Sequence, residues 1–454
     1  MKRLLKILKY ILITLIALFG IGFILNVVSF VPAKIKNNPW KINEGLPLII
    51  PHGGAKVLYP ENTKYAFDQT AKYDVFEIDL SITSDGVLIS HHDTDLKIST
   101  GIADKISELK YIEVKQKIEE SDYYLARNFK DTSGNYPYKN TTDEQLLKEF
   151  IPVDLEYMFQ TYPNHRYILE IKDTIANSGE EVYKKASDKL YNLIVEYEMI
   201  DKVLVASFDD AVIKDFRNKE KHIPTGMAWN ESLKFVVQSA FGVDFFYKPV
   251  AEVMVLPNTD EKLKKGGTEE GLIKMLPGFI GNKIAKKYED GYYHINLTHR
   301  TMVKDIHRQG MAVLYWTVND KEEMLHLIKL GVDGIITDRP DLLEEVIAEY
   351  KIGQWKLSYF FLYIYTMQVR GGIVKQQLKK GVLEIFVLAI LLKEDSYGYK
   401  IITDLKPYIE ISESALYPVL RRLEEQDKLE TYNEVFEGRN RKYYKVTKKG
   451  KHQS

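Results

Sequence analysis

The chain has 454 residues, which is room for two or three domains of ordinary size or for one large barrel with a smaller domain. Hydrophobic residues make up 45% and charged residues 28%, a composition that excludes wholesale disorder. Lys and Arg total 63 against 64 Asp and Glu, so a globally basic nucleic-acid binder is excluded, although a local basic patch is not. The absence of cysteine excludes disulfide scaffolds, thiol nucleophiles and thiolate metal sites, which leaves Asp, Glu, His and carbonyl groups as metal ligands.

The N-terminus has a basic flank over residues 1–9, followed by an uncharged, largely apolar run over residues 10–31. As a helix, this run would be about 33 Å long, enough to cross a bilayer core of about 30 Å. The alternative is a cleaved signal peptide, whose apolar region is usually only about 7 to 15 residues long. The pattern therefore predicts a transmembrane anchor in a single-pass protein of the cell membrane. Its basic N-terminus would be cytoplasmic and the part of the chain after residue 31 extracellular.

Between residues 46 and 349, short apolar runs alternate with amphipathic helical patterns. This alternation predicts an α/β fold, a (β/α)8 TIM-type barrel. A doubly wound open sheet is the competing architecture, but the chain lacks a Gly-rich dinucleotide turn after its first strand. Residues 104–150 and 257–293 break the alternation and are interpreted as excursions over one face of the barrel. The predicted strands are 46–51, 75–82, 167–172, 203–207, 223–227, 252–256, 312–318 and 334–337.

Acidic side chains lie on two of the predicted strands. Glu77 and Asp79 are two residues apart and so share one face of a strand, as do Glu170 and Lys172. Carboxylates that face a barrel interior are costly unless they bind a cation or form ion pairs. Three inward carboxylates predict an oxygen-rich site for Ca2+ or Mg2+.

Two histidines also follow predicted strands, His52 after the first and His92 after a short strand over 87–90. Histidines are suited to act as acid and base near neutral pH. Each motif alone also has a structural interpretation, since Asp93 could cap a turn and Glu170 could form an ion pair with Lys172. The ordered set favours the catalytic interpretation.

Eight motifs occur in order along the barrel segment. They are His52-Gly53-Gly54, Pro60-Glu61-Asn62-Thr63, Glu77-x-Asp79, Asp85-Gly86, His92-Asp93, Glu170-x-Lys172, Trp316-Thr317-Val318-Asn319 and 331–340. Together they resemble the glycerophosphodiester phosphodiesterase family over residues 48–347. The resemblance implies a TIM-type barrel, in agreement with the strand pattern. It also implies a metal-dependent phosphoric diester hydrolase of lipid or phosphoglycerol metabolism, which converts glycerophosphodiesters to glycerol phosphate and an alcohol.

The resemblance also implies roles for nine residues. They are Glu77, Asp79 and Glu170 as ligands of a divalent cation, Ca2+ or Mg2+; His52 and His92 as the general acid–base pair; Lys172 and Asn62 as groups that contact the substrate or order the site; Trp316 as an apolar wall beside the glycerol; and Glu61 as a metal ligand or its neighbour. The attacking group is left open between water and the neighbouring glycerol hydroxyl, which would pass through a cyclic phosphate.

One position departs from the family pattern. The family usually has an arginine directly after its first histidine as a phosphate contact, and this chain has Gly53 there. Glycine cannot replace a bidentate phosphate contact. Lys56 or Lys172 could compensate, or the preferred substrate could differ. We expect a reduced but real diesterase activity.

The pattern changes after residue 349. Residues 350–375 form a predicted aromatic linker, whose apolar part, 355–367, is too short for an ordinary membrane span. Helical patterns then cover 382–392, 396–405 and 412–426, and alternating segments follow at 428–433 and 441–446. Three helices before a β-hairpin predict a winged helix, a small α+β domain over residues 376–454.

Several motifs of this segment resemble PadR-type winged-helix regulators over residues 376–451, among them Tyr397-Gly398-Tyr399, 416–420 and 441–444. Residues 371–454 hold 16 Lys and Arg against 12 Asp and Glu, a local basic surplus. The resemblance implies nucleic acid as a partner; the alternative is a helical cap or a protein-binding module. The candidate DNA-facing residues are Ser412, Ser414, Tyr417, Arg439 and Arg441.

The two resemblances conflict in topology, because one N-terminal span would place the barrel outside the cell and DNA lies inside. Either residues 355–367 cross the membrane in a strained way, or the C-terminal segment never meets DNA. The chain could also join two neighbouring reading frames near Met367, and a juxtaposition without functional coupling is the favoured interpretation. Two function classes follow: a membrane-anchored hydrolase, or a membrane-tethered DNA-binding regulator with a barrel sensor. A sensor would not need both histidines, so the complete set of site residues favours the enzyme.

Overall fold

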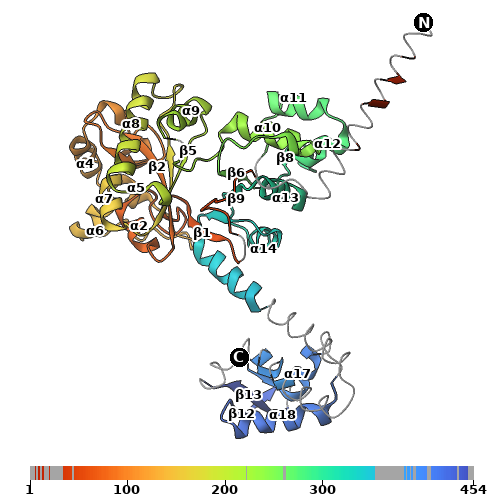
Figure 1. Ribbon diagram of the computed structural model, residues 1–454. Helices are drawn as coiled ribbons and strands as arrows, with labels where there is room; N and C mark the ends of the chain where they lie inside the picture. The colour runs from red at the N-terminus through yellow and green to blue at the C-terminus, as the bar shows by residue number, and fades with distance from the viewer. Residues whose placement is uncertain are drawn as a thin grey trace. The chain divides into compact units, whose positions relative to one another are not determined.

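The computed structural model describes residues 34–42, 45–220, 222–258, 262–352, 395–405, 411–436 and 439–447, with isolated positions between 6 and 20 and between 383 and 391. The chain divides into two compact units, Met1–Ile347 and Ala348–Ser454, and each is described by itself (Figure 1). The predicted linker over 350–375 lies mostly outside the described residues.

The structure contradicts the predicted single-pass membrane location. Within the described parts of the chain, no helix combines the length and the apolar character that crossing a membrane requires. Most of the predicted span over residues 10–31 lies outside these parts. The prediction of a cytoplasmic N-terminus and an extracellular catalytic domain depended on such a helix and is therefore wrong.

Two four-stranded sheets form the centre of the first unit, with strand orders β1-β10-β9-β6 and β3-β2-β4-β5. All their ladders are parallel except that of β3 (Leu88–Ser90) with β2. Parallel bridges from Val205 to Thr225 and from Gly226 to Val253 link β5 to β6, and β1 lies beside β2. The result is a TIM-barrel-like α/β fold. The other strands are β1 (Leu48–Pro51), β2 (Val75–Ile82), β4 (Arg166–Ile171), β5 (Val203–Ala206), β6 (Val253–Pro257), β9 (Ala312–Trp316) and β10 (Gly334–Thr337).

Helices connect these strands, and their ends follow capping rules. For example, the Asp320 side chain accepts a hydrogen bond from the backbone N–H of Glu323 at the start of α14, and Gly331 ends this helix with a φ of 76°. The connecting helices are α2 (Lys64–Thr70), α7 (Leu155–Thr161), α8 (Glu180–Glu196), α9 (Asp210–Lys219), α10 (Trp229–Ala240), α13 (Arg300–Gln309) and α14 (Lys321–Leu330).

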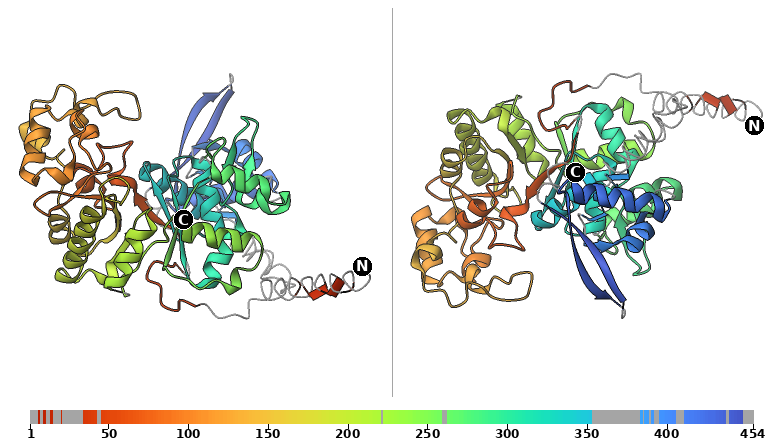
Figure 2. Two further views of the ribbon diagram at one scale, coloured as in Figure 1. Left: turned by 90° about the horizontal axis from the view of Figure 1, so that it is seen from above. Right: turned by 90° about the horizontal axis from the view of Figure 1, so that it is seen from below.

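The two segments that break the alternation form structure of their own. The first includes α4 (Tyr111–Glu120), α5 (Tyr124–Asn128) and α6 (Glu144–Lys148). The second includes α11 (Thr268–Met275), α12 (Gly278–Ile284) and a hairpin of β7 (Ala285–Lys287) and β8 (Tyr293–Ile295). Both views of Figure 2 place the orange helices of the first segment and the green helices of the second on opposite sides of this unit.

The barrel interior is packed with apolar side chains, one or more from each of its ladder-forming parallel strands. They are Ile50, Val75, Ile168, Leu204, Val253, Ala312, Leu314 and Ile336. Trp40 is fully buried against this cluster, and the Arg166 guanidinium lies 4.1 Å from the centre of its ring. Because Val75, Val253 and Ala312 begin their strands, Trp40 closes the amino-terminal end of the barrel, which leaves the carboxyl end for the site.

The second unit has the elements of a winged helix. α17 (Gly398–Leu405) and α18 (Glu413–Glu425) precede a hairpin of β12 (Leu429–Phe436) and β13 (Arg439–Val446), and β11 (Ser396–Tyr397) pairs with β13. Its core joins apolar side chains of both helices and the hairpin, including Ile401, Leu416, Leu420 and Tyr444. The predicted first helix, 382–392, lies partly outside the described residues.

Candidate active site

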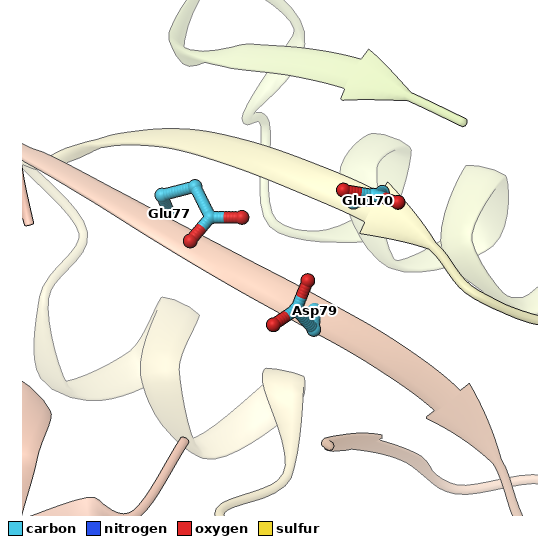
Figure 3. A group of neighbouring side chains, drawn as sticks. All are labelled: Glu77, Asp79 and Glu170. Atoms are coloured by element: carbon cyan, nitrogen blue, oxygen red, sulfur yellow. The ribbon is translucent and has the colours of Figure 1, made fainter. Parts of the chain in front are cut away.

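Three carboxylates meet at the carboxyl end of the barrel. Glu77 and Asp79 are on β2 and Glu170 is on β4, where it lies directly beside Asp79 in the strand register. One oxygen from each residue lies within 4.8 Å of the others. Figure 3 shows the three side chains gathered over the two neighbouring strands. The inward orientation predicted from the two-residue spacing is present.

Burial and mutual repulsion disturb the ionisation of this cluster. Burial and the neighbouring charge of Asp79 raise the pKa of Glu77 to about 7. Burial alone would also raise the pKa of Asp79, but the Lys172 and Lys56 ammonium groups hold it below its usual value. Burial raises the pKa of Glu170, although Lys172 opposes this shift. The three carboxylates offer only oxygen ligands, and their surroundings oppose the ionisation of Glu77 and Glu170. Such a cluster fits a divalent cation, whose charge would stabilise all three carboxylates.

Lys172 is the nearest cation to the cluster. Its Nζ lies 3.0 Å from Glu170 Oε1 and 3.3 Å from Asp79 Oδ1. Burial disfavours its charged form, but Glu170 and Asp79 outweigh that effect and raise the pKa of Lys172 above its usual value. It therefore stays charged and could attract an anionic phosphodiester.

His52 follows β1 and is held by a partner that the sequence analysis did not assign. Its Nδ1 lies 2.8 Å from Asp338 Oδ1, and Asn319 Nδ2 donates to the other oxygen of Asp338. Burial alone would lower the pKa of His52, but the Asp338 hydrogen bond and the nearby Glu77 raise it overall. Because a carboxylate only accepts, Nδ1 carries the proton and Nε2 is left for chemistry. Asp338 and Asn319 lie in motifs already noted, which was the available signal.

His92 lies at the other predicted catalytic position. Its Nδ1 is 2.9 Å from Asp93 Oδ1, and its side chain is 40% exposed. It is near enough to Asp79 and Glu170 to affect the pKa of both. The adjacent His91 is instead buried, with its ring nitrogens near the Asp93 carbonyl and the Ser99 hydroxyl, so it has a structural role.

Asn62 and Glu61 come from the loop before α2. Asn62 Nδ2 donates to Asp79 Oδ2 at 2.9 Å, while Asn62 Oδ1 is buried without a hydrogen-bond partner in the described structure. Such an atom is costly unless a ligand uses it. Glu61 is not among the three clustered carboxylates; its Oε2 lies 2.8 Å from Lys56 Nζ.

The backbone at Gly53 also contacts the cluster, because its N–H donates to Glu77 Oε2 at 2.6 Å. The Lys56 ammonium lies 3.7 Å from Asp79 Oδ2. Burial disfavours its charged form, but Asp79 and Glu61 raise the pKa of Lys56 overall. A second, half-buried cation thus stands beside the position where the family usually has arginine.

Trp316 ends β9, and Thr317 directly after it has its hydroxyl 3.5 Å from His52 Nδ1. The Trp316 ring meets Phe208 edge-on, with centroids 5.5 Å apart. The site therefore has a polar side of carboxylates and lysines and an apolar side of aromatic rings.

The residues predicted to face DNA lie in the second unit. Ser412 precedes α18, Ser414 and Tyr417 lie on it, and Tyr417 is 46% exposed. Arg441 lies on β13, with its guanidinium 4.2 Å from the centre of the Tyr397 ring. Arg439 begins the same strand, and its side chain lies outside the described structure.

Comparison with known proteins gives the family of each part of the chain. Residues 52–342 match the Glycerophosphoryl diester phosphodiesterase family, and residues 387–454 match the Transcriptional regulator PadR-like family. The first match covers more than half of the chain. The chain therefore belongs to the glycerophosphoryl diester phosphodiesterase family and is a phosphoric diester hydrolase.

Similar proteins come from several organisms. A glycerophosphodiester phosphodiesterase of Caldanaerobacter subterraneus subsp. tengcongensis is 24% identical over 66% of this chain and 98% of its own length. The lysophospholipase D GDPD1 of Homo sapiens is 25% identical over 66% of this chain and 86% of its own. A crystal structure of a glycerophosphoryl diester phosphodiesterase domain from Mycobacterium tuberculosis is 15% identical, with a TM-score of 0.49, and covers 66% of this chain and 98% of that one.

Proposed function

We propose that the first unit is a metal-dependent phosphodiesterase that hydrolyses glycerophosphodiesters to glycerol phosphate and an alcohol, with His52 and His92 as its acid and base. The observation that carries the proposal is the cluster of Glu77, Asp79 and Glu170. These residues would hold Ca2+ or Mg2+, which when bound stabilises negative charge on a phosphoryl oxygen.

The environments of the histidines support different roles for them. Asp338 stabilises the protonated form of His52, so His52 is suited to donate a proton from Nε2 to the leaving alkoxide. His92 is more exposed and has Asp93 to hold its ring, so it is suited to take the proton of the attacking hydroxyl. The P–O bond to the alcohol breaks and a new P–O bond forms to the attacking oxygen, whether that of water or of the neighbouring glycerol hydroxyl.

The lysines and Asn62 support the binding of the rest of the phosphodiester. Lys172 and Lys56 offer two half-buried ammonium groups to its phosphate oxygens. Asn62 Oδ1, which has no partner in the described structure, would accept a hydrogen bond from a glycerol hydroxyl. Trp316 is suited to pack against the carbon side of the glycerol.

The test is the release of glycerol phosphate from glycerophosphoethanolamine by the full chain, with Ca2+, with Mg2+ and with a chelator. We expect activity that needs a divalent cation and falls at least a hundredfold in His92→Asn. The exposed His222→Asn variant serves as the matched control. Chelator-resistant activity, or equal rates in His92→Asn and wild type, would overturn the proposal.

A second proposal concerns the second unit, where the PadR-like match and the exposed start of α18 support nucleic-acid binding. Ser412, Ser414 and Tyr417 would face the DNA, with Arg439 and Arg441 on the hairpin. Fluorescence anisotropy of the full chain with duplex DNA tests this. We expect binding that weakens with salt and with Tyr417→Ala; salt-independent binding, or none, would contradict it.

A further inference from the structure

Asn258 is a buried polar residue at the carboxyl end of β6, and the proposed reaction assigns it no role. β6 pairs with β9, and their register ends where Pro257 lies beside Trp316. The backbone N–H of Asn258 continues this pairing, because it donates to the Trp316 carbonyl at 2.9 Å. β9 ends at Trp316, and the next residue, Thr317, lies beside His52. Asn258 therefore stands where the barrel wall passes into the proposed active site.

The side chain of Asn258 holds the chain beyond the last pair of the ladder. Its Nδ2 donates to the Thr317 carbonyl at 2.8 Å and lies 3.4 Å from Glu323 Oε2 on α14. The two N–H bonds of the amide are thus matched by two acceptors, which fixes the plane of the side chain. Asn258 therefore binds two successive carbonyls, that of Trp316 through its backbone and that of Thr317 through its side chain.

Trp316 and Thr317 both present side chains to the proposed active site. The Trp316 ring belongs to its apolar side, where it meets Phe208. The Thr317 hydroxyl lies 3.5 Å from His52 Nδ1, and a group at this distance limits the rotation of the imidazole ring. The position of both side chains depends on the backbone that carries them.

The far end of the same segment is attached to the chain that follows β10. Asn319 Oδ1 accepts a hydrogen bond from the backbone N–H of Asp338 at 2.9 Å. Residues 316–319 thus bridge the carboxyl ends of β6 and β10. Loss of the Asn258 amide would release the β6 side of this bridge while the β10 side stays attached. The Thr317 hydroxyl would then no longer be fixed relative to the histidine.

We propose that Asn258 is a positioning residue of the phosphodiesterase reaction and acts through the carbonyls of Trp316 and Thr317. It keeps the Trp316 ring beside the glycerol, and it keeps the Thr317 hydroxyl beside His52, whose Nε2 stays aimed at the leaving oxygen. The proposal rests on the proposed function, because it adds a residue to the same site. A displacement of about 1 Å in such a supporting element can cost about a hundredfold in rate.

The test compares Asn258→Asp with wild type on glycerophosphoethanolamine and on glycerophospho-p-nitrophenol, an ester whose phenolate leaves without a proton. The new carboxylate faces two acceptors, the Thr317 carbonyl and the Glu323 carboxylate, so repulsion replaces the hydrogen bond. We expect kcat to fall about tenfold to a hundredfold on the first substrate and about threefold or less on the second. KM should rise on both substrates, because both contain the glycerol beside Trp316. An equal loss of kcat on the two substrates with unchanged KM would show a purely structural role and overturn the proposal.

Two further variants control the comparison. Asn218→Asp makes the same change of charge at an exposed asparagine of α9, and its kinetics should match those of wild type. Asn258→Leu keeps the branching of the side chain but removes its donors without adding charge, so it tests the proposal even if Asn258→Asp does not fold. It should show the same difference between the two substrates. Wild-type kcat and KM in Asn258→Leu would overturn the proposal.

Fluorine NMR of the full chain labelled with fluorotryptophan separates this proposal from the proposed function. The Trp316 signal, assigned with Trp316→Phe, should shift in Asn258→Asp and stay in place in Asn218→Asp. If wild type hydrolyses neither diester, this shift would show that Asn258 holds the segment while the proposed function fails. Hydrolysis by wild type, with unchanged kinetics and an unchanged Trp316 signal in Asn258→Asp, would overturn the positioning role and leave the proposed function intact.

Discussion

Lys56 occupies the space that a side chain at Gly53 would need. A Cβ atom on Gly53 would lie 2.7 Å from Lys56 Cε, and the φ of Gly53 is 51°, in the left-handed region that favours glycine. The family usually carries arginine at this position. In this chain the position is glycine, and the side chain of Lys56 fills the space that a side chain there would take. We infer that Lys56 is the phosphate-contacting cation of this chain.

Replacement of Lys56 by methionine, which keeps the length of the side chain, should lower kcat/KM about tenfold to a hundredfold. The reason is that hydrogen bonds to charged groups contribute about 1.5–3 kcal/mol. Steady-state kinetics with glycerophosphoethanolamine measures the change, and Lys97→Met on the exposed surface is the control. A rate equal to wild type would show that Lys172 alone supplies the phosphate contact.

Gly53→Ala should lower activity through Lys56, because the new methyl group displaces that side chain. The backbone conformation should also cost about 1 kcal/mol of folding stability. In a double-mutant cycle, Lys56→Ala and Gly53→Ala should be strongly non-additive in kcat/KM, the second change adding little to the first. Additive losses would mean that the two positions act independently.

The pH dependence of catalysis should reveal the link between Asp338 and His52. Asp338 raises the pKa of His52, so Asp338→Asn should let burial lower it. If His52 acts as the acid, activity disappears as pH rises through its pKa, and the alkaline limb of kcat/KM should move to lower pH in Asp338→Asn. A limb that stays in place while the rate falls would indicate a purely structural role for Asp338.

Metal binding should depend on pH through Glu77. Burial and Asp79 raise the pKa of Glu77 to about 7, so in the absence of metal it is protonated below that pH. Cation binding requires the ionised form, so it should release a proton at pH 6, and affinity should rise between pH 6 and pH 8. Calorimetry with Ca2+ in buffers of different ionisation enthalpy measures this release, and Asp79→Asn should abolish binding. Binding without proton release at pH 6 would contradict this prediction.

Trp40 should be important for the stability of the barrel. It is fully buried against apolar side chains from several strands, so Trp40→Ala should lower the free energy of unfolding by about 3–5 kcal/mol. Chemical denaturation of the full chain, followed by a spectroscopic signal from the first unit, measures this free energy of unfolding. A loss below about 1 kcal/mol would show that the amino-terminal end of the barrel is closed by other residues.

The strand pattern predicted most of the first unit because parallel strands buried on both faces appear as continuous apolar runs. β2 and β10 have the predicted boundaries, and the predicted strand at 223–227 is reduced to single bridges at Thr225 and Gly226. The membrane location was wrong, since hydropathy of an N-terminal run does not by itself establish a spanning helix. The sequence named Lys56 only as one of two lysines that could compensate for Gly53, and it gave Asp338 no role within its motif. Both assignments depend on side-chain contacts that only the folded chain shows.

Proton donation by His52 to the leaving alkoxide is the step on which the proposed mechanism depends. The most direct measurement compares His52→Ala with wild type on glycerophosphoethanolamine and on glycerophospho-p-nitrophenol, whose leaving group needs no proton. We expect His52→Ala to lose at least a hundredfold in rate on the first substrate and less than tenfold on the second, whereas His92→Ala should lose activity on both. Equal losses on the two substrates in His52→Ala would contradict it.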